Sequence, residues 1–220
     1  MIPLFPLPLV LFPKAVQPLH IFEPRYRQML ADCLASNREF GVICRAPESH
    51  EEDITPGTVG CMARVESTQP LSDGRSNIMV IGGDRFEFRS LVEMGTPYHS
   101  ASVEGVIDIE VDGAALVPVA GSVREVFGRA GHAARTMQDD ASALPELPED
   151  PAELSFAVAQ YVDLPLEFRQ RLLTSRSPLD RLTMLAGTLG PMVSQLEVGA
   201  QVHARARTNG HGHGLVAGEA

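Results

Sequence analysis

The first thirteen residues constrain the fold more than any other segment. They read MIPLFPLPLVLFP, an apolar run interrupted by prolines at positions 3, 6, 8 and 13. Proline fixes φ and has no backbone N–H, so this spacing prevents a helix. The run is also shorter than the ~20 residues of a membrane span, and it lacks the positive start of a signal peptide. We therefore expect extended structure from the N-terminus, with prolines at strand ends or sheet edges, and no contact with a membrane.

One early helix is predicted to begin at Glu23-Pro24, because proline suits the first helical position. Its apolar residues recur with the period of a single helix face, at Tyr26, Met29, Leu30, Cys33 and Leu34. The helix should end near residues 36–37. Lys14 lies before it, and we expect an exposed turn there between the first short strands.

The following segment is typical of a β-rich domain. Short extended stretches are predicted at residues 4–5, 9–12 and 16–22, and further strands at 40–44, 59–66, 78–81, 86–89 and 99–111. Asp73-Gly74 is a hairpin signal between two extended runs. Gly82-Gly83 is predicted to form a second sharp turn.

After Asp112-Gly113 the pattern becomes helical. Helices are predicted at residues 114–137, from Pro151 behind an Asp150-to-Glu153 capping box, at 166–173, and from Pro178 with Ser177 as N-cap. From about residue 201 the sequence is small, polar and rich in Gly and His. The sequence therefore predicts an α+β chain with three parts: a β domain at 1–113, a helical bundle at 114–200 and a disordered tail at 201–220.

Lysine is nearly absent, and this excludes two enzyme classes. Of the 18 basic residues, 17 are arginines and one is Lys14. A phosphate-binding P-loop and a Ser-Lys dyad both require a lysine in a specific context. Lys14 has no glycine-rich loop before it. An ATPase of the P-loop type and a Ser-Lys protease are therefore not expected, and a Schiff-base enzyme would have to use Lys14.

No metal or cofactor site is predicted. Cys33, Cys44 and Cys61 form no Cys-x-x-Cys pair, so they are interpreted as reduced, buried thiols of a cytoplasmic protein. His50 precedes an acidic run but lacks HExxH spacing. The remaining candidates are tail histidines, which would bind metal weakly: His203, His211 and His213.

Three segments together resemble a known family. They are LFPLPLVLFPKAVQPLHIFEPRYRQML at 4–30, PGTVGCMARVESTQPLSDGRSNIMVIGGDRFEF at 56–88 and LPLEFRQRLLTSRSPLDRLTMLAGTL at 164–189. In this order they resemble the N-terminal domain of Lon protease, especially its free-standing bacterial relatives, over roughly residues 2–198. The resemblance implies a PUA-like β-barrel with an early inserted helix, followed by a small helical bundle. It also implies a region that engages substrate proteins and carries neither ATPase nor peptidase.

The polar residues around the first strand-to-helix junction are the candidate binding residues. They are His20, Glu23, Arg25 and Arg27, with Arg85 as a more distant candidate. One interpretation is a helix cap and ion-pair lattice that fixes this corner. The other is the rim of a peptide groove, in which arginines bind carboxylates or carbonyls. No catalytic residues are predicted.

The leading functional hypothesis is a non-catalytic module that binds unfolded or extended polypeptide segments and serves a protease or chaperone. One alternative is an RNA-binding PUA-like protein, but charge argues against it, because residues 1–115 hold 9 basic and 16 acidic side chains. The other is an unrecognised hydrolase, which needs a Cys or Ser beside a His. An apolar N-terminal edge could also support a homodimer.

Overall fold

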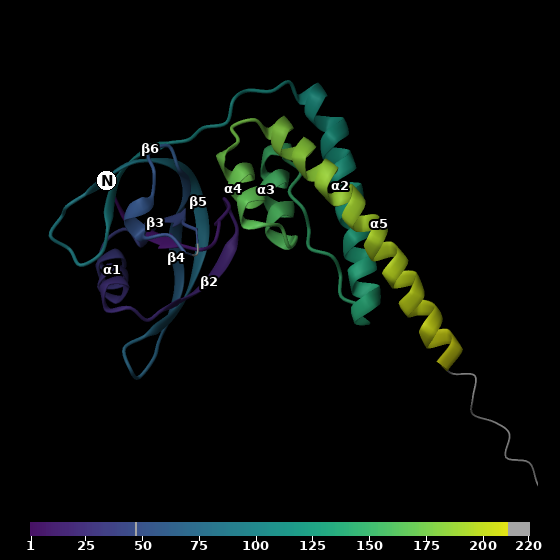
Figure 1. Ribbon diagram of the computed structural model, residues 1–220, viewed down its shortest axis with the longest axis horizontal. Coiled ribbons are helices and arrows are strands. Elements are labelled where there is room, and N and C mark those ends of the chain that lie inside the picture. Colours follow the sequence, from purple (N-terminus) through teal and green to yellow (C-terminus); the bar gives the residue numbers. More distant parts are fainter. Residues whose placement is uncertain (47, 211–220) are drawn as a thin grey trace, which may run out of the picture.

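The fold comes from a computed structural model, which describes residues 1–46 and 48–210. Figure 1 shows a strand-rich part beside a helical part whose long helices α2 and α5 lie side by side. The strands are β1 (Ile2–Leu7), β2 (Val16–Ile21), β3 (Glu39–Cys44), β4 (Val59–Pro70), β5 (Ser76–Val92) and β6 (Ser100–Gly105). The helices are α1 (Pro24–Ala35), the short 3₁₀ turn η1 (Glu51–Asp53), α2 (Gly113–Gln138), α3 (Pro151–Tyr161), α4 (Leu166–Thr174) and α5 (Pro178–Gly210). The predicted α+β class is confirmed.

The six strands form one sheet in the order β2-β5-β4-β3-β1-β6, and β6 also pairs with β5. Five strands therefore form a closed circuit of pairing, which is the connectivity that a β-barrel requires. All neighbouring strands are antiparallel except β1 and β3, which are parallel and separated in the sequence by β2 and α1. The long strand β5 makes the closure possible, because its first half pairs with β2 and its second half with β6.

The apolar N-terminal run lies inside the structure. β1 pairs with β3 on one side and with β6 on the other, so it offers no free edge of the kind that motivated the predicted homodimer. The sheet edge belongs to β2, where Pro18 lacks an N–H and weakens pairing with another strand. Residues 9–12 were expected to be extended; they form no strand, yet Val10, Leu11 and Phe12 are buried.

Gly82-Gly83 makes no turn, so that expectation is wrong. β5 runs through both glycines to Val92. The backbone of the loop before β2 crosses the strand here: the Lys14 N–H donates to the Gly82 carbonyl at 2.7 Å, and the Gly82 N–H donates to Ala15 at 2.9 Å. A Cβ at Gly82 would lie 2.0 Å from the Phe12 carbonyl oxygen. The glycine therefore permits a close backbone contact.

The helices follow their local signals closely. Pro24 occupies the first turn of α1. The Asp150 side chain accepts a hydrogen bond from the Glu153 N–H at 2.9 Å, and the Ser177 hydroxyl accepts one from Asp180 at 3.1 Å. Both predicted N-caps are therefore present.

The tail is the exception. α5 continues to Gly210, whereas disorder was predicted from residue 201; residues 211–220, with His211 and His213, lie outside the described residues. The physical reason is that residues 200–206 are mostly alanine, arginine and glutamine, which favour helix, and that this segment packs on α2. Ala200 is buried, and His203 Nε2 lies 3.3 Å from Asp139 at the end of α2.

The core is shared by the sheet and the helices. One cluster of buried apolar side chains includes residues from the N-terminal run, the strands and α2–α5. Phe12 stacks on Phe156 of α3 with ring centroids 5.7 Å apart, and the Arg169 guanidinium lies over Phe12 at 4.9 Å. No helix in the described ranges is long and apolar enough to cross a bilayer.

Candidate functional site

A buried ionic cluster fixes the junction between the sheet and the helices. Asp108, in the extended segment between β6 and α2, accepts two hydrogen bonds of 2.7 Å from Arg181 of α5 and another from Arg85 of β5. Arg181 is fully buried and Arg85 is 6% exposed. Arg85 also donates to the carbonyls of Leu173 and Ser175, at 2.8 and 2.7 Å. The Asp108 carboxylate therefore links the segment before α2 to both β5 and α5.

Opposing effects act on the ionisation of this cluster. Burial disfavours the charged form of Asp108, but hydrogen bonds and charge from Arg181 and Arg85 outweigh burial and hold the pKa of the carboxyl below its usual range. Burial lowers the pKa of Arg85, and Asp108 opposes that shift. Two guanidinium groups also lie over the Phe156 ring, Arg181 at 4.2 Å and Arg85 at 5.3 Å from its centroid. The ring is therefore held in place by cations as well as by Phe12.

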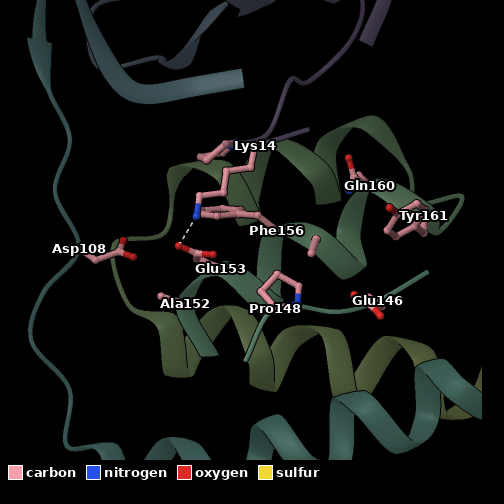
Figure 2. Close-up of a pocket in the computed structure, with 11 residues that line it drawn as sticks. Lys14, Asp108, Glu146, Pro148, Ala152, Glu153, Phe156, Gln160 and Tyr161 are labelled. Carbon is pink, nitrogen blue, oxygen red and sulfur yellow. Dashed lines mark hydrogen bonds and ion pairs between the residues drawn. The ribbon is translucent and has the colours of Figure 1, made fainter. Parts of the chain in front are cut away.

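The largely apolar pocket at this junction is the candidate site. Its volume is about 310 Å³, at the small end of the range for ligand pockets. Figure 2 shows its lining, which comes from the loop before β2, the 106–112 segment, the 146–148 segment and α3. The lining residues are Pro13, Lys14, Asp108, Glu146, Pro148, Ala152, Glu153, Phe156, Ala157, Gln160 and Tyr161.

Lys14 is placed at the pocket by the loop that crosses β5. It has a left-handed backbone, with φ of 62°, and its N–H is held by Gly82. Its ammonium group forms an ion pair with Glu153, drawn as a dashed line in Figure 2. Both side chains are well exposed, as expected for Lys14, so the pair contributes little to stability. It does fix a polar group at the edge of an apolar surface.

The opposite side of the pocket is formed by the segment before α3. The Arg124 side chain of α2 donates to the backbone carbonyls of Pro148 and Glu149, the latter at 3.1 Å. These bonds hold Pro148 against the pocket while the Glu146 carboxylate stays exposed. Tyr161 is half exposed at the end of α3 and contacts Phe127 of α2, with centroids 6.1 Å apart.

The predicted corner residues form two separate groups. Arg25 donates to Glu23 at 2.8 Å and 2.9 Å and makes two bonds of 2.8 Å to Glu51, which also contacts His99 at 3.1 Å. Every guanidinium nitrogen of Arg25 is therefore engaged. This arrangement is what the ion-pair lattice interpretation predicts, and it uses four of the five N–H donors of Arg25 within the lattice.

His20 and Arg27 lie near the β4–β5 hairpin. His20 Nδ1 is 2.7 Å from the Asn77 side-chain oxygen, and the Arg27 guanidinium lies against Gly74 at the hairpin turn. Arg85 does not join either group, because it is buried in the Asp108 cluster. Its assignment to an exposed groove rim therefore conflicts with its position.

Sequence reasoning missed Asp108, Phe156 and Arg181. Asp108 and Arg181 are 73 positions apart, and no local period relates them. The alternation of residues 106–111, VIDIEV, was no guide, because it places Asp108 with Glu110 on an outer face, whereas Ile107 and Ile109 are the exposed side chains.

Nucleophilic side chains and histidines are not paired in the part of the chain that the structure describes. No Ser or Cys side chain among the described residues hydrogen-bonds to a histidine, and no cluster of them could hold a metal ion. Burial raises the pKa of Cys33 to about 11 and that of Cys61 to about 12, and the backbone and Arg85 only partly offset this for Cys61. Both thiols are therefore protonated near neutral pH, which disfavours a nucleophilic role.

These features define an α+β module with a closed strand circuit, an appended helical bundle and an apolar pocket at the junction. Residues 1–189 match the family model of the ATP-dependent protease La (LON) substrate-binding domain. The chain therefore belongs to that family, as the resemblance in its sequence indicated.

Individual relatives agree with this assignment. Lon protease 2 of Herpetosiphon aurantiacus is 26% identical over 86% of this chain, and the Lon protease of Anaeromyxobacter dehalogenans is 29% identical over 74%. These matches span 23% and 20% of those proteins. Among solved structures, a Lon N-terminal domain protein of Xanthomonas campestris (TM-score 0.58, 24% identity) and the N-terminal domain of a Mycobacterium avium complex Lon protease (TM-score 0.63, 16% identity) each align over 84% of this chain and 95% of theirs. These two likenesses show the fold.

Proposed function

We propose that this protein is a non-catalytic module that binds unfolded or extended polypeptide segments, and that the junction pocket receives one apolar side chain of the segment. The observation that carries the proposal is the pocket itself, in a chain of a substrate-binding family. Its floor is apolar, formed by Phe156, Ala157 and Pro148, and its edge is polar, with Lys14 and Glu153. This combination is typical of sites that bind an apolar group and orient it with a few polar contacts.

The size and rigidity of the pocket support this reading. A volume of about 310 Å³ accommodates one large side chain with part of its neighbours. Burying such a side chain contributes about 1.5–3 kcal/mol, so a single site gives weak binding that several segments of an unfolded chain could reinforce. Phe156 is fixed by Phe12 and Arg181, so little ordering accompanies binding.

A protease or chaperone that receives the bound segment is the partner such a module would serve. We also assign it to the cytoplasm, because Cys33, Cys44 and Cys61 are free, as expected in a reducing compartment. No observation on the described residues favours RNA binding or hydrolysis.

The test is to fill the pocket and measure peptide binding. The probe is a fluorescein-labelled, unstructured peptide with one Phe, compared with the same peptide carrying Ser. Ala157→Phe should weaken binding about tenfold, or about 1.4 kcal/mol, because the new ring occupies the pocket. The matched control is Ala115→Phe, at an exposed position of α2 outside the lining.

Three outcomes contradict the proposal. Wild-type protein could bind neither peptide, both peptides could bind equally well, or Ala157→Phe could bind like wild type. Far-UV circular dichroism of both variants excludes unfolding as the cause of a loss.

A further inference from the structure

The charged side chains that line the junction pocket differ in whether they have an ion-pair partner. Asp108 is bound by Arg85 and Arg181, and Glu153 is paired with Lys14. Glu146 is different: among the side chains that the structure describes, no cation lies within ion-pair distance of its carboxylate. Glu146 is therefore the one charged lining side chain of the described chain that has no ion-pair partner, and it is exposed, whereas the excess positive charge of Arg85 and Arg181 over Asp108 is buried against the Phe156 ring.

The surrounding segment adds to this negative charge. Residues 146–153 read ELPEDPAE, with four acidic side chains and no basic one. Glu149 likewise has no ion-pair partner in the described ranges, whereas Asp150 caps α3. The nearest basic side chain from the helices, Arg124, is bonded to the backbone carbonyls of this segment. The bonds from Arg124 hold the segment against the pocket and do not involve the Glu146 carboxylate, which stays exposed.

We infer that the pocket selects segments in which an apolar residue is flanked by arginine or lysine, with the cation paired to Glu146. This inference rests on the proposed function and adds a substrate class to it. The apolar side chain would occupy the space above Phe156 and Ala157, and the flanking cation would reach the Glu146 side of the opening (Figure 2). An acidic flank would meet Glu146 with like charge, which opposes binding.

The size of the preference follows from exposure. A partly exposed ion pair between a peptide arginine and Glu146 contributes little binding free energy. Repulsion between a peptide glutamate and Glu146 weakens binding by a comparable amount. The expected preference of wild type for a basic over an acidic flank is therefore about five- to tenfold in Kd at low salt. It should shrink toward unity near ~0.5 M NaCl, because salt screens exposed charges.

The experiment uses three unstructured peptides that share one Phe anchor and differ only in its flanking residues, which are Arg, Gln or Glu. Each is titrated against wild type, Glu146→Gln, Glu146→Arg and the control Glu66→Gln, an exposed residue of β4 outside the lining. We expect the order Arg, Gln, Glu for wild type and for Glu66→Gln. Glu146→Gln should abolish most of the preference, and Glu146→Arg should reverse it.

The outcomes separate this inference from the proposed function. If all three peptides bind wild type equally and Ala157→Phe weakens all of them, the pocket binds polypeptides and the charge selection is wrong. If the preference persists unchanged in Glu146→Arg, another surface creates it and the inference is also overturned. If no peptide binds wild type, both fail. Because Glu146 is exposed, its variants should unfold at the wild-type temperature, which checks that a lost preference is not misfolding.

Discussion

At the scale of single residues, Asp108 is the most consequential side chain. It is the shared acceptor of two buried guanidinium groups that come from β5 and α5. Its removal would leave both cations near the core without a counter-charge, and an uncompensated buried charge costs far more than an exposed one. The carboxylate therefore holds the junction pocket in shape without having to touch a ligand.

Replacing Asp108 by asparagine should lower the free energy of unfolding by about 3–5 kcal/mol. Urea denaturation at pH 7 measures this, and an unchanged m-value would show that the native and unfolded states stay comparable. Asp73→Asn is the matched control. Hydrogen bonds from Arg75 lower the pKa of Asp73 to about 2, but this pair is exposed on a hairpin, so solvent screens it and little stability should be lost. Equal losses in the two variants would contradict the role of the buried cluster.

The Asp108 carboxyl also makes the stability of the wild-type protein depend on pH, with a definite sign. The pKa of Asp108 is lowered in the folded protein, so the unfolded chain binds more protons in acid. The stability from Asp108 is present above the unfolded pKa of about 3.9 and is lost as pH falls from there through the folded pKa. As pH falls below about 5, stability should therefore decrease more steeply for wild type than for Asp108→Asn. Parallel curves would count against this assignment.

At the scale of elements, local signals predicted the helices well. Proline at the start of α1, the Asp150 cap of α3 and the Ser177 cap of α5 are short-range features, and the structure contains each of them. The strands were harder, because pairing depends on distant residues. Gly82 shows why: its glycine signal was interpreted as a turn, whereas the chain before β2 crosses β5 there.

The candidate site could not be predicted for a similar reason. Its parts come from the loop before β2, the segment after β6 and α3, and only folding brings them together. The sequence indicated Lys14 as an exposed turn residue but not its partner Glu153 on α3. The corner residues near α1 carried a stronger local motif, and the structure uses Arg25 in an ion-pair lattice.

The end of α5 gives a prediction at this scale. Val202→Pro should remove helical structure from about residue 198 onward, because proline lacks the N–H and clashes with the preceding turn. In wild type, the ¹³Cα chemical shifts of residues 199–206 should show helix, and in the variant these shifts should approach random coil. Val202→Ala is the control and should keep the helix. Random-coil shifts in wild type would show instead that these residues are disordered in solution.

At the scale of the whole molecule, the sheet and the helices share one hydrophobic core. Phe12 and Phe156 stack across the junction, Arg169 of α4 donates to the Val10 carbonyl at 3.3 Å, and Gln170 donates to the Val59 carbonyl at 2.9 Å. The junction pocket is lined by both parts, so its shape depends on both being folded. A ligand that binds there would stabilise both parts together.

This shared core predicts cooperative unfolding. Phe156→Ala removes a buried ring of α3 and should destabilise the protein by about 3–5 kcal/mol. If the core is one cooperative unit, native-state hydrogen exchange should show this loss in the most protected amides of β3 and β4 as well as in α3. Val117→Ala, at an exposed position of α2, should change neither the free energy of unfolding nor the protection of these amides. If protection fell in the helices while β3 and β4 kept wild-type values, the two parts would unfold independently. The pocket between them would then open without global unfolding, and a bound segment could be released by a motion of the helical part alone.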